Sequence, residues 1–301
     1  MLQKSTSKGT LLIVIAGIFW GSMGLFVRQL TAWGFTSIQV VSCRLTIAAI
    51  IFALVLLGKD RRGFIIRQRD ILLFLGLGLC SILFFTCCYF TAIELMSMSV
   101  AAILLYTSPV WVMLMSAVFF GERITGNKVL ALILSVAGCA LVSGIGGGSI
   151  TPLGLLIGLG AGFGYGLYSI LGNIALKRYS AYTVTTYTFL IAAAGSFLIS
   201  NPGEMITKIG IFENLPLLFG FIVLTGIVTA VVPFLCYTIG LKSVEPGRAA
   251  ILATIEPIVA TVLGALIFDE KITLLSGSGI ICVVTAIVIL SYSSAKPFER
   301  Y

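Results

Sequence analysis

Ten long apolar segments constrain this chain more than any other feature of its sequence. A helix needs roughly 20 apolar residues to cross about 30 Å of hydrocarbon, and nearly every charged residue lies between stretches of about that length. Hydrophobic side chains make up 59% of the 301 residues and charged ones only 10%, which is more apolar surface than a soluble fold could bury. The sequence therefore predicts an integral membrane protein.

The segments predict an all-α bundle of ten transmembrane helices. The alternating pattern of a barrel strand is absent, and only a helix satisfies its backbone hydrogen bonds within one segment in lipid. The expected spans are residues 10–30, 37–58, 71–93, 97–121, 128–146, 152–175, 182–200, 215–240, 248–268 and 274–293. An even number of spans puts both termini on the same side.

Lysine and arginine are distributed unevenly between the two sets of connecting segments. Fifteen lie on the side of the termini, three lie on the other side (Arg28, Lys208 and Lys271), and Arg44 lies inside a span. The acidic residues split five against five, with Glu256 inside a span. Because only the basic residues are biased, the positive-inside rule predicts cytoplasmic termini. The same rule explains the net charge of +8, and no basic helix face suggests a nucleic-acid partner.

The chain contains an internal repeat. A shift of 148 residues aligns identical residues without a gap: Tyr89 with Tyr237, residues 101–104 with 249–252, Pro109 with Pro257, Phe120 with Phe268, Glu122 with Glu270 and residues 124–125 with 272–273. A shift of 145 residues aligns Gly17, Trp20 and Gly21 with Gly162, Tyr165 and Gly166. We therefore expect two five-helix repeats, 1–148 and 149–301. Because five is odd, the second repeat must be inverted, as in many secondary transporters.

Two prolines lie near the middle of the fourth and ninth spans. Pro109 and Pro257 each remove one backbone donor and leave the carbonyl of Leu105 or Ala253 unpaired, so a kink is expected at each. Proline is also common in membrane helices for shape alone. A symmetric pair, one in each repeat, favours a hinge and a broken-helix site at the repeat interface.

Two charged residues lie within the spans. Glu256 directly precedes Pro257, and a carboxylate near the bilayer centre costs on the order of 3 kcal/mol unless it is paired, hydrated or protonated. We expect Glu256 to face the interior, where Ser108 is its counterpart in the first repeat. Arg44 lies about 10 Å from the outer end of its span, so it suits a structural anchor as well as a substrate contact. A static pair between Glu256 and Arg44 is the alternative to a transport role.

Catalytic and metal-binding patterns are absent from the sequence. There is no histidine, nucleophile elbow, Walker loop or HExxH motif, and the seven cysteines lie within apolar spans without a CxxC pair. We therefore expect no enzymatic activity, no catalytic residues, no metal and no cofactor. Among the aromatic residues, Trp33 and Tyr301 suit the membrane interface, whereas those within spans could line a cavity.

Three motifs give the chain a family resemblance: residues 19–22 (Phe-Trp-Gly-Ser), residues 101–109, and residues 122–125 repeated at 270–273. With its ten spans in two halves, the sequence resembles the EamA family of the drug/metabolite transporter superfamily. The resemblance implies a multi-pass carrier in the inner membrane of a bacterial cell, often an exporter of amino acids or other metabolites. It marks these cavity or hinge positions: Trp20, Tyr89, Pro109, Tyr165, Tyr237 and Pro257. The family usually has a second tryptophan where this chain has Tyr165.

The sequence thus predicts a secondary transporter that moves small metabolites or drugs across the membrane by alternating access, with export as the expected direction. The alternative is a membrane scaffold or lipid-processing protein that needs only a static ion pair. The expected partners are the small-molecule substrate and membrane lipids, and proton coupling would suit Glu256; no particular oligomeric state is indicated. The candidate residues for substrate binding or coupling are Glu256, Arg44, Trp20, Tyr89, Ser108, Tyr165 and Tyr237, and the candidate hinges are Pro109 and Pro257.

Overall fold

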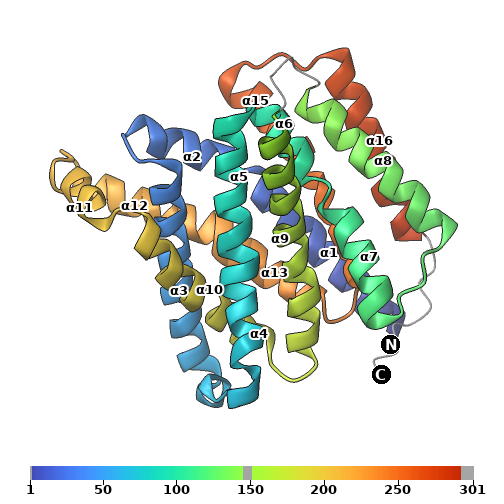
Figure 1. The fold of residues 1–301 in the computed structure, drawn as a ribbon, viewed down its shortest axis with the longest axis horizontal. Helices are drawn as coiled ribbons and strands as arrows, with labels where there is room; N and C mark the ends of the chain where they lie inside the picture. The colour runs from blue at the N-terminus through green and yellow to red at the C-terminus, as the bar shows by residue number, and fades with distance from the viewer. Residues whose placement is uncertain (1, 145–150, 293–301) are drawn as a thin grey trace.

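The computed structural model describes residues 2–144 and 151–292, and these residues form helices without any strand (Figure 1). Within these described residues, ten helical segments are long and apolar enough to cross a membrane, which confirms the predicted all-α bundle. They are Ser7–Ala32, Ser37–Lys59, Gln68–Leu95, Met98–Phe120, Gly126–Ser143, Pro152–Leu176, Ala181–Ile199, Leu215–Gly240, Pro246–Phe268 and Leu274–Ser291. Residues 145–146 and 293, which the predicted spans included, lie outside the described residues, as do the repeat boundary at 148 and Tyr301.

Five of the ten spans are single helices, and five are interrupted. The uninterrupted ones are α3 (Ser37–Lys59), α8 (Gly126–Ser143), α9 (Pro152–Leu176), α10 (Ala181–Ile199) and α16 (Leu274–Tyr292). The interrupted ones are α1 (Leu2–Gly21) with α2 (Met23–Ala32), α4 (Ile71–Leu75) with α5 (Phe84–Leu95), α6 (Met98–Leu105) with α7 (Ser108–Phe120), α12 (Leu215–Gly226) with α13 (Val232–Gly240), and α14 (Pro246–Leu252) with α15 (Glu256–Phe268). A short helix, α11 (Pro202–Gly210), precedes α12.

The two proline-containing spans are broken, not merely kinked. In the fourth span α6 ends at Leu105 and α7 begins at Ser108, and in the ninth a 3₁₀ turn over Ala253–Ile255 separates α14 from α15. Each proline falls in the first turn of the second helix. A backbone N–H has no intrahelical partner there, so proline costs little at this position. The prolines therefore start new helices instead of distorting continuous ones.

Other local features recur 148 residues apart. A π-helical stretch over Gly76–Leu83 joins α4 to α5, and a second one over Ile227–Val231 joins α12 to α13. The helices α7 and α15 both end on a residue with left-handed backbone, Gly121 with φ 63° and Asp269 with φ 54°. The repeated sequence thus adopts similar local structure in both halves.

Helix packing follows the same correspondence. The helix α3 packs against α10, and α8 packs against α16, which pairs the second span with the seventh and the fifth with the tenth. The contact of α5 with α9 is matched by that of α13 with α1, and the contact of α7 with α9 by that of α15 with α1 (Figure 1). This pattern is the one expected if the second half of the chain is an inverted copy of the first.

Glycines allow the broken spans to approach α1 and α9 closely. A Cβ atom added at Gly21 would lie 2.5 Å from the carbonyl oxygen of Glu256, and one at Gly166 would lie 3.2 Å from that of Ser108. Small residues at helix crossings permit such backbone contact in membrane proteins. The breaks in the fourth and ninth spans are therefore held directly against α9 and α1.

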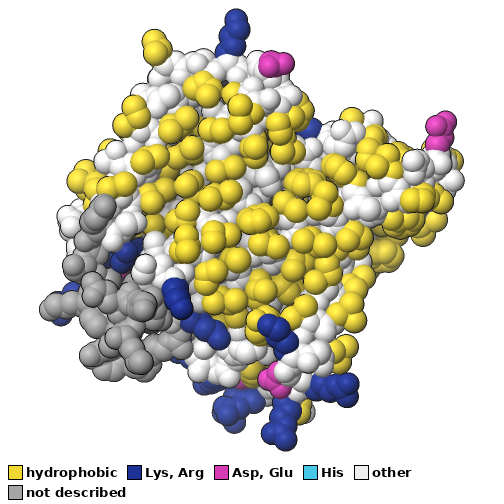
Figure 2. All heavy atoms as spheres, turned by 180° about the vertical axis from the view of Figure 1, so that it is seen from behind, with side chains coloured by type: hydrophobic (Ala, Val, Ile, Leu, Met, Phe, Trp, Pro, Cys, Tyr) yellow, Lys and Arg dark blue, Asp and Glu magenta, His cyan; other side chains and the backbone are white. Residues whose placement is uncertain are grey.

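The outer surface is suited to lipid. Figure 2 shows a broad belt of hydrophobic side chains, with lysine and arginine gathered at one end of the molecule. We call this end the basic face; its charged residues include Lys59, Arg61, Arg62, Arg67, Arg69, Arg123, Lys177, Arg178 and Lys242. The other end, the opposite face, carries α11 and the basic residues Arg28, Lys208 and Lys271. The asymmetry predicted from the sequence is thus retained in the fold.

Candidate functional site

The main cavity lies between the two halves of the chain and has a volume of about 440 Å³. Small-molecule sites typically enclose roughly 300–1,000 Å³, so this space suits a small ligand. Its walls come from α1, α2, α5, α6, α8 and α15, and they include Trp20, Met23, Arg28, Tyr89, Ser99, Tyr106, Ser143, Glu256, Pro257, Thr261 and Glu270. The side chains of Arg28 and Glu270 are 54% and 49% exposed at its rim. The cavity therefore opens at the opposite face.

Glu256 supplies the carboxylate of the main cavity. It is the first residue of α15, directly after the break in the ninth span, and it is half-buried. The hydroxyl of Tyr165 donates a hydrogen bond to its Oε2 at 3.2 Å. Tyr89 and Tyr106, which line the same cavity, are close enough to interact electrostatically with this carboxylate. A polar cluster thus surrounds the break, and Glu256 faces the interior of the molecule.

Arg44 lies one layer behind the cavity wall. It is only 4% exposed in α3, its guanidinium contacts Sδ of Met23, and Met23 in turn lines the cavity. Its Nε has no hydrogen-bond partner. Arg44 and Glu256 interact through their charges, but they form no ion pair among the described residues. The static pair that the scaffold alternative requires is therefore not formed in this conformation.

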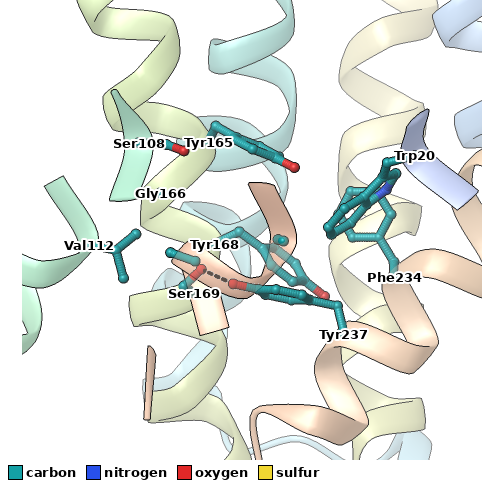
Figure 3. Close-up of a pocket in the computed structure, with 11 residues that line it drawn as sticks. Trp20, Ser108, Val112, Tyr165, Gly166, Tyr168, Ser169, Phe234 and Tyr237 are labelled. Atoms are coloured by element: carbon teal, nitrogen blue, oxygen red, sulfur yellow. Dashed lines mark hydrogen bonds between the residues drawn. The ribbon is translucent and has the colours of Figure 1, made fainter. Parts of the chain in front are cut away.

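An aromatic plug separates the main cavity from the basic face. It consists of Trp20, Tyr165, Tyr168, Phe234 and Tyr237 (Figure 3). The ring of Trp20 packs against three of the others, with its centroid 5.0 Å from that of Phe234, 5.3 Å from that of Tyr237 and 6.0 Å from that of Tyr165. Trp20 and Tyr237 are only 6% and 4% exposed. These rings block passage from the main cavity toward the basic face.

A second, much smaller cavity of about 20 Å³ lies within the plug. It has room for about one water molecule. Ser108, Ser169 and Tyr237 are among the residues that line it, and the hydroxyls of Ser169 and Tyr237 lie 2.8 Å apart (Figure 3). The hydroxyl groups of this lining are able to form hydrogen bonds with water.

A buried ion cluster closes the basic face itself. Lys128 Nζ lies 2.8 Å from Oε1 of Glu122 and 2.6 Å from Oε2 of Glu245. Glu122 also accepts the backbone N–H of Gly247 at 3.3 Å, and its side chain is only 2% exposed. Burial raises the pKa of Glu122, although Lys128 acts in the opposite direction. The cluster links the end of α7 and the start of α8 to the segment that begins α14.

The structure brings the predicted site residues together in two groups. Trp20, Tyr89, Glu256 and Pro257 line the main cavity, and Ser108, Tyr165 and Tyr237 line the small one together with Trp20. Pro109 is buried next to Ser108. A transport role for these residues, and for Arg44 behind them, stays a prediction.

Sequence reasoning missed some residues of the two cavities and predicted others only in general terms. The Arg28–Glu270 pair of the main cavity and Phe234 of the plug were not among the candidates. Tyr106 of the main cavity and Tyr168 of the plug belong to the aromatic residues within spans that the sequence marked as able to line a cavity. The sequence held one signal for Glu270, because it is the repeat counterpart of Glu122. The repeat alone could not show which side chain either glutamate meets.

Trp33 occupies the kind of position expected for an interfacial residue. It follows α2 at the opposite face, and its ring packs 5.2 Å from Phe212 and 5.1 Å from Phe221, measured between centroids. These contacts belong to an apolar cluster in which α11 packs against α2 and α3. Tyr301, the other predicted anchor, lies outside the described residues.

Comparison with known proteins agrees with this architecture. Residues 7–144 and 152–292 each match the EamA-like transporter family. An uncharacterized transporter of Archaeoglobus fulgidus is 29% identical over 88% of this chain and 90% of its own length. The uncharacterized inner membrane transporter YicL of Salmonella typhimurium is 23% identical over 97% of this chain and 98% of its own length. A solved crystal structure with 18% identity has the same fold, with a TM-score of 0.78 over 94% of this chain and 96% of that one. The chain therefore belongs to the EamA-like transporter family.

Proposed function

We propose that this membrane transport protein is a secondary carrier that exports small metabolites bearing an amine group, such as amino acids, by alternating access. The observation that carries this proposal is the carboxylate of Glu256, which lies in a cavity of about 440 Å³ that is open at one face and plugged at the other. A binding site near the middle of a membrane protein, accessible from one side at a time, is what alternating access requires.

The surroundings of Glu256 favour a cationic partner. Its one hydrogen bond among the described residues comes from Tyr165, so a carboxylate that can accept about four hydrogen bonds keeps most of its capacity. An intramembrane carboxylate is costly, and such residues usually serve function. An ammonium group could bind this carboxylate, with the rings of Trp20, Tyr89 and Tyr106 available for cation–π contact.

Competition at one carboxylate also provides a coupling mechanism. Glu256 can hold either a proton or the ammonium group of a substrate, and binding of one excludes the other. An exporter would take up the proton from outside and release it when substrate binds from the cytoplasm. The inward proton gradient would then drive the outward movement of the substrate.

The orientation of the carrier follows from its charges. Because the basic face carries most of the lysine and arginine residues, the positive-inside rule places it in the cytoplasm. The relative from Salmonella is named an inner membrane transporter, which supports the same membrane for this chain. In that orientation the conformation described here is open to the outside.

The test is transport by Glu256→Gln in proteoliposomes, after a thermal-shift screen of amino acids and related metabolites has identified a ligand. Glutamine keeps the shape and much of the hydrogen bonding but cannot titrate. We expect the variant to lose dependence on the pH gradient and to bind amines at least tenfold more weakly, as the loss of a charged hydrogen bond implies. Glu94→Gln, which removes an exposed carboxylate from α5, is the matched control. Normal transport by Glu256→Gln at every pH would refute the role of Glu256.

A further inference from the structure

Two glutamates occupy equivalent positions at opposite faces of the molecule. Glu122 follows α7 and Glu270 follows α15, and the residue before each has left-handed backbone, with φ 63° at Gly121 and 54° at Asp269. Each glutamate donates its backbone N–H to the carbonyl six residues earlier, at 3.3 Å in both cases. The local backbone is therefore the same, and a difference between their side chains must come from the surrounding helices.

At the basic face the side chain of Glu122 is docked on the other half of the chain. Its Oε2 accepts the N–H of Gly247, in the first turn of α14, and Lys128 ties it to Glu245. A Cβ atom added at residue 247 would lie 2.8 Å from Oε1 of Glu122, so the contact needs glycine there. This docking closes the basic face while the main cavity is open at the other.

At the opposite face the equivalent contact is open. The residue 148 positions before Gly247 is Ser99, which lies in the first turn of α6 and lines the main cavity together with Glu270. The carboxylate of Glu270 instead pairs with Arg28 at 2.7 Å, half-exposed to solvent. The guanidinium of Arg28 also lies 4.5 Å above the ring of Phe268, which holds the pair at the rim.

We propose that Glu122 and Glu270 are the two gating residues of the transport cycle and dock in alternation, each on the first helical turn that faces it. Glu122 is docked on Gly247 in the outward-open state, and Glu270 docks on the backbone N–H of Ser99 in the inward-open state. A carboxylate is stabilised at a helix N-terminus by unpaired N–H groups and the helix dipole. Rocking of one group of helices against the other would make one docking and break the other.

This inference rests on the alternating access proposed above, and its test separates the two. Nitroxide labels are placed at Met98 and Lys271, two exposed residues next to Ser99 and Glu270, in a variant that lacks the seven native cysteines and retains transport. The distance between the labels, measured by pulsed electron paramagnetic resonance, is long when the outer mouth is open and short when it is closed.

The two glutamates should shift this distance distribution in opposite directions. Glu122→Gln weakens the cytoplasmic docking, so the ratio of closed to open outer mouths should rise by roughly tenfold, as expected for one charge-assisted hydrogen bond. Glu270→Gln should lower the same ratio by a similar factor. Gly247→Ala should act like Glu122→Gln, because its Cβ displaces the carboxylate while leaving every charge in place. Glu94→Gln should leave the distribution unchanged.

The outcomes distinguish the two proposals. A single label distance in the wild type under every substrate and pH condition would refute alternating access. Two wild-type distances whose ratio moves in the same direction in both glutamate variants, or does not move in either, would overturn only the gating assignment. Should Glu122→Gln fail to fold, Gly247→Ala and Glu270→Gln still test the opposite shifts.

Discussion

The contact between α1 and the break in the ninth span makes a quantitative prediction for Gly21→Ala. The new Cβ would lie 2.5 Å from the carbonyl oxygen of Glu256 and 2.6 Å from Cβ of Val259, whereas ordinary contacts begin near 3.4 Å. The helices α1 and α15 must therefore separate by about 1 Å, and overpacking of this kind costs about 1–3 kcal/mol. The carbonyl oxygen of Glu256 belongs to the backbone and cannot rotate away, so we expect the upper part of that range.

The assay is thermal unfolding of purified protein in detergent, with Gly24→Ala as the matched control. A Cβ at Gly24, one turn along in α2, would meet no atom within 4 Å, and alanine is favoured over glycine in a helix by up to about 1 kcal/mol. We expect Gly21→Ala to lower Tm by roughly 3–6 °C and Gly24→Ala to leave it unchanged or raise it. A wild-type Tm for Gly21→Ala, or equal losses in both variants, would refute the close contact.

Two further predictions concern the basic face. In intact cells an impermeant maleimide should label Lys271→Cys but not Arg62→Cys in a background without native cysteines; labelling of Arg62→Cys alone would reverse the orientation. Because burial raises the pKa of Glu122, the folded state binds this proton more tightly than the unfolded state. The free energy of unfolding should therefore decrease as the pH rises from the ordinary pKa of glutamate through the raised pKa of Glu122. Thermal unfolding of Glu122→Gln over the same pH interval should lack this decrease. An identical decrease in the variant would contradict its origin in Glu122.

The sequence predicted the membrane spans and the main cavity's carboxylate because lipid limits the alternatives so strongly. A segment of sufficient length and hydropathy can only be a helix there, so the predicted ends differ from the observed ones by a few residues. A carboxylate inside such a segment must face the interior, as Glu256 does. The two matching prolines likewise located both helix breaks, which lie in the turn before each proline, where its missing N–H leaves a carbonyl unpaired.

The contacts that close and open the molecule could not be predicted in the same way. The approach of Lys128 to Glu122 and Glu245 depends on how distant connecting segments meet in one conformation, and hydropathy carries no information about that. The interruption of the first span after Gly21 has no proline to signal it. Arg28 contributed to the charge count of the opposite face, yet its role at the cavity rim appears only when α2 and the end of α15 are placed side by side.

The two repeats match at the proposed gates but differ at the proposed binding site. The glutamates at the two faces, Glu122 and Glu270, are identical in sequence and local backbone, so each face can close by equivalent contacts. At the two breaks the residues differ, because Glu256 faces the main cavity whereas its counterpart Ser108 lies beside the plug. A substrate amine would therefore be held at the ninth span in both states, while the helices around it change which face is open. In the proposed cycle the repeat would supply the alternation, and the single carboxylate would hold the substrate and the proton at one place.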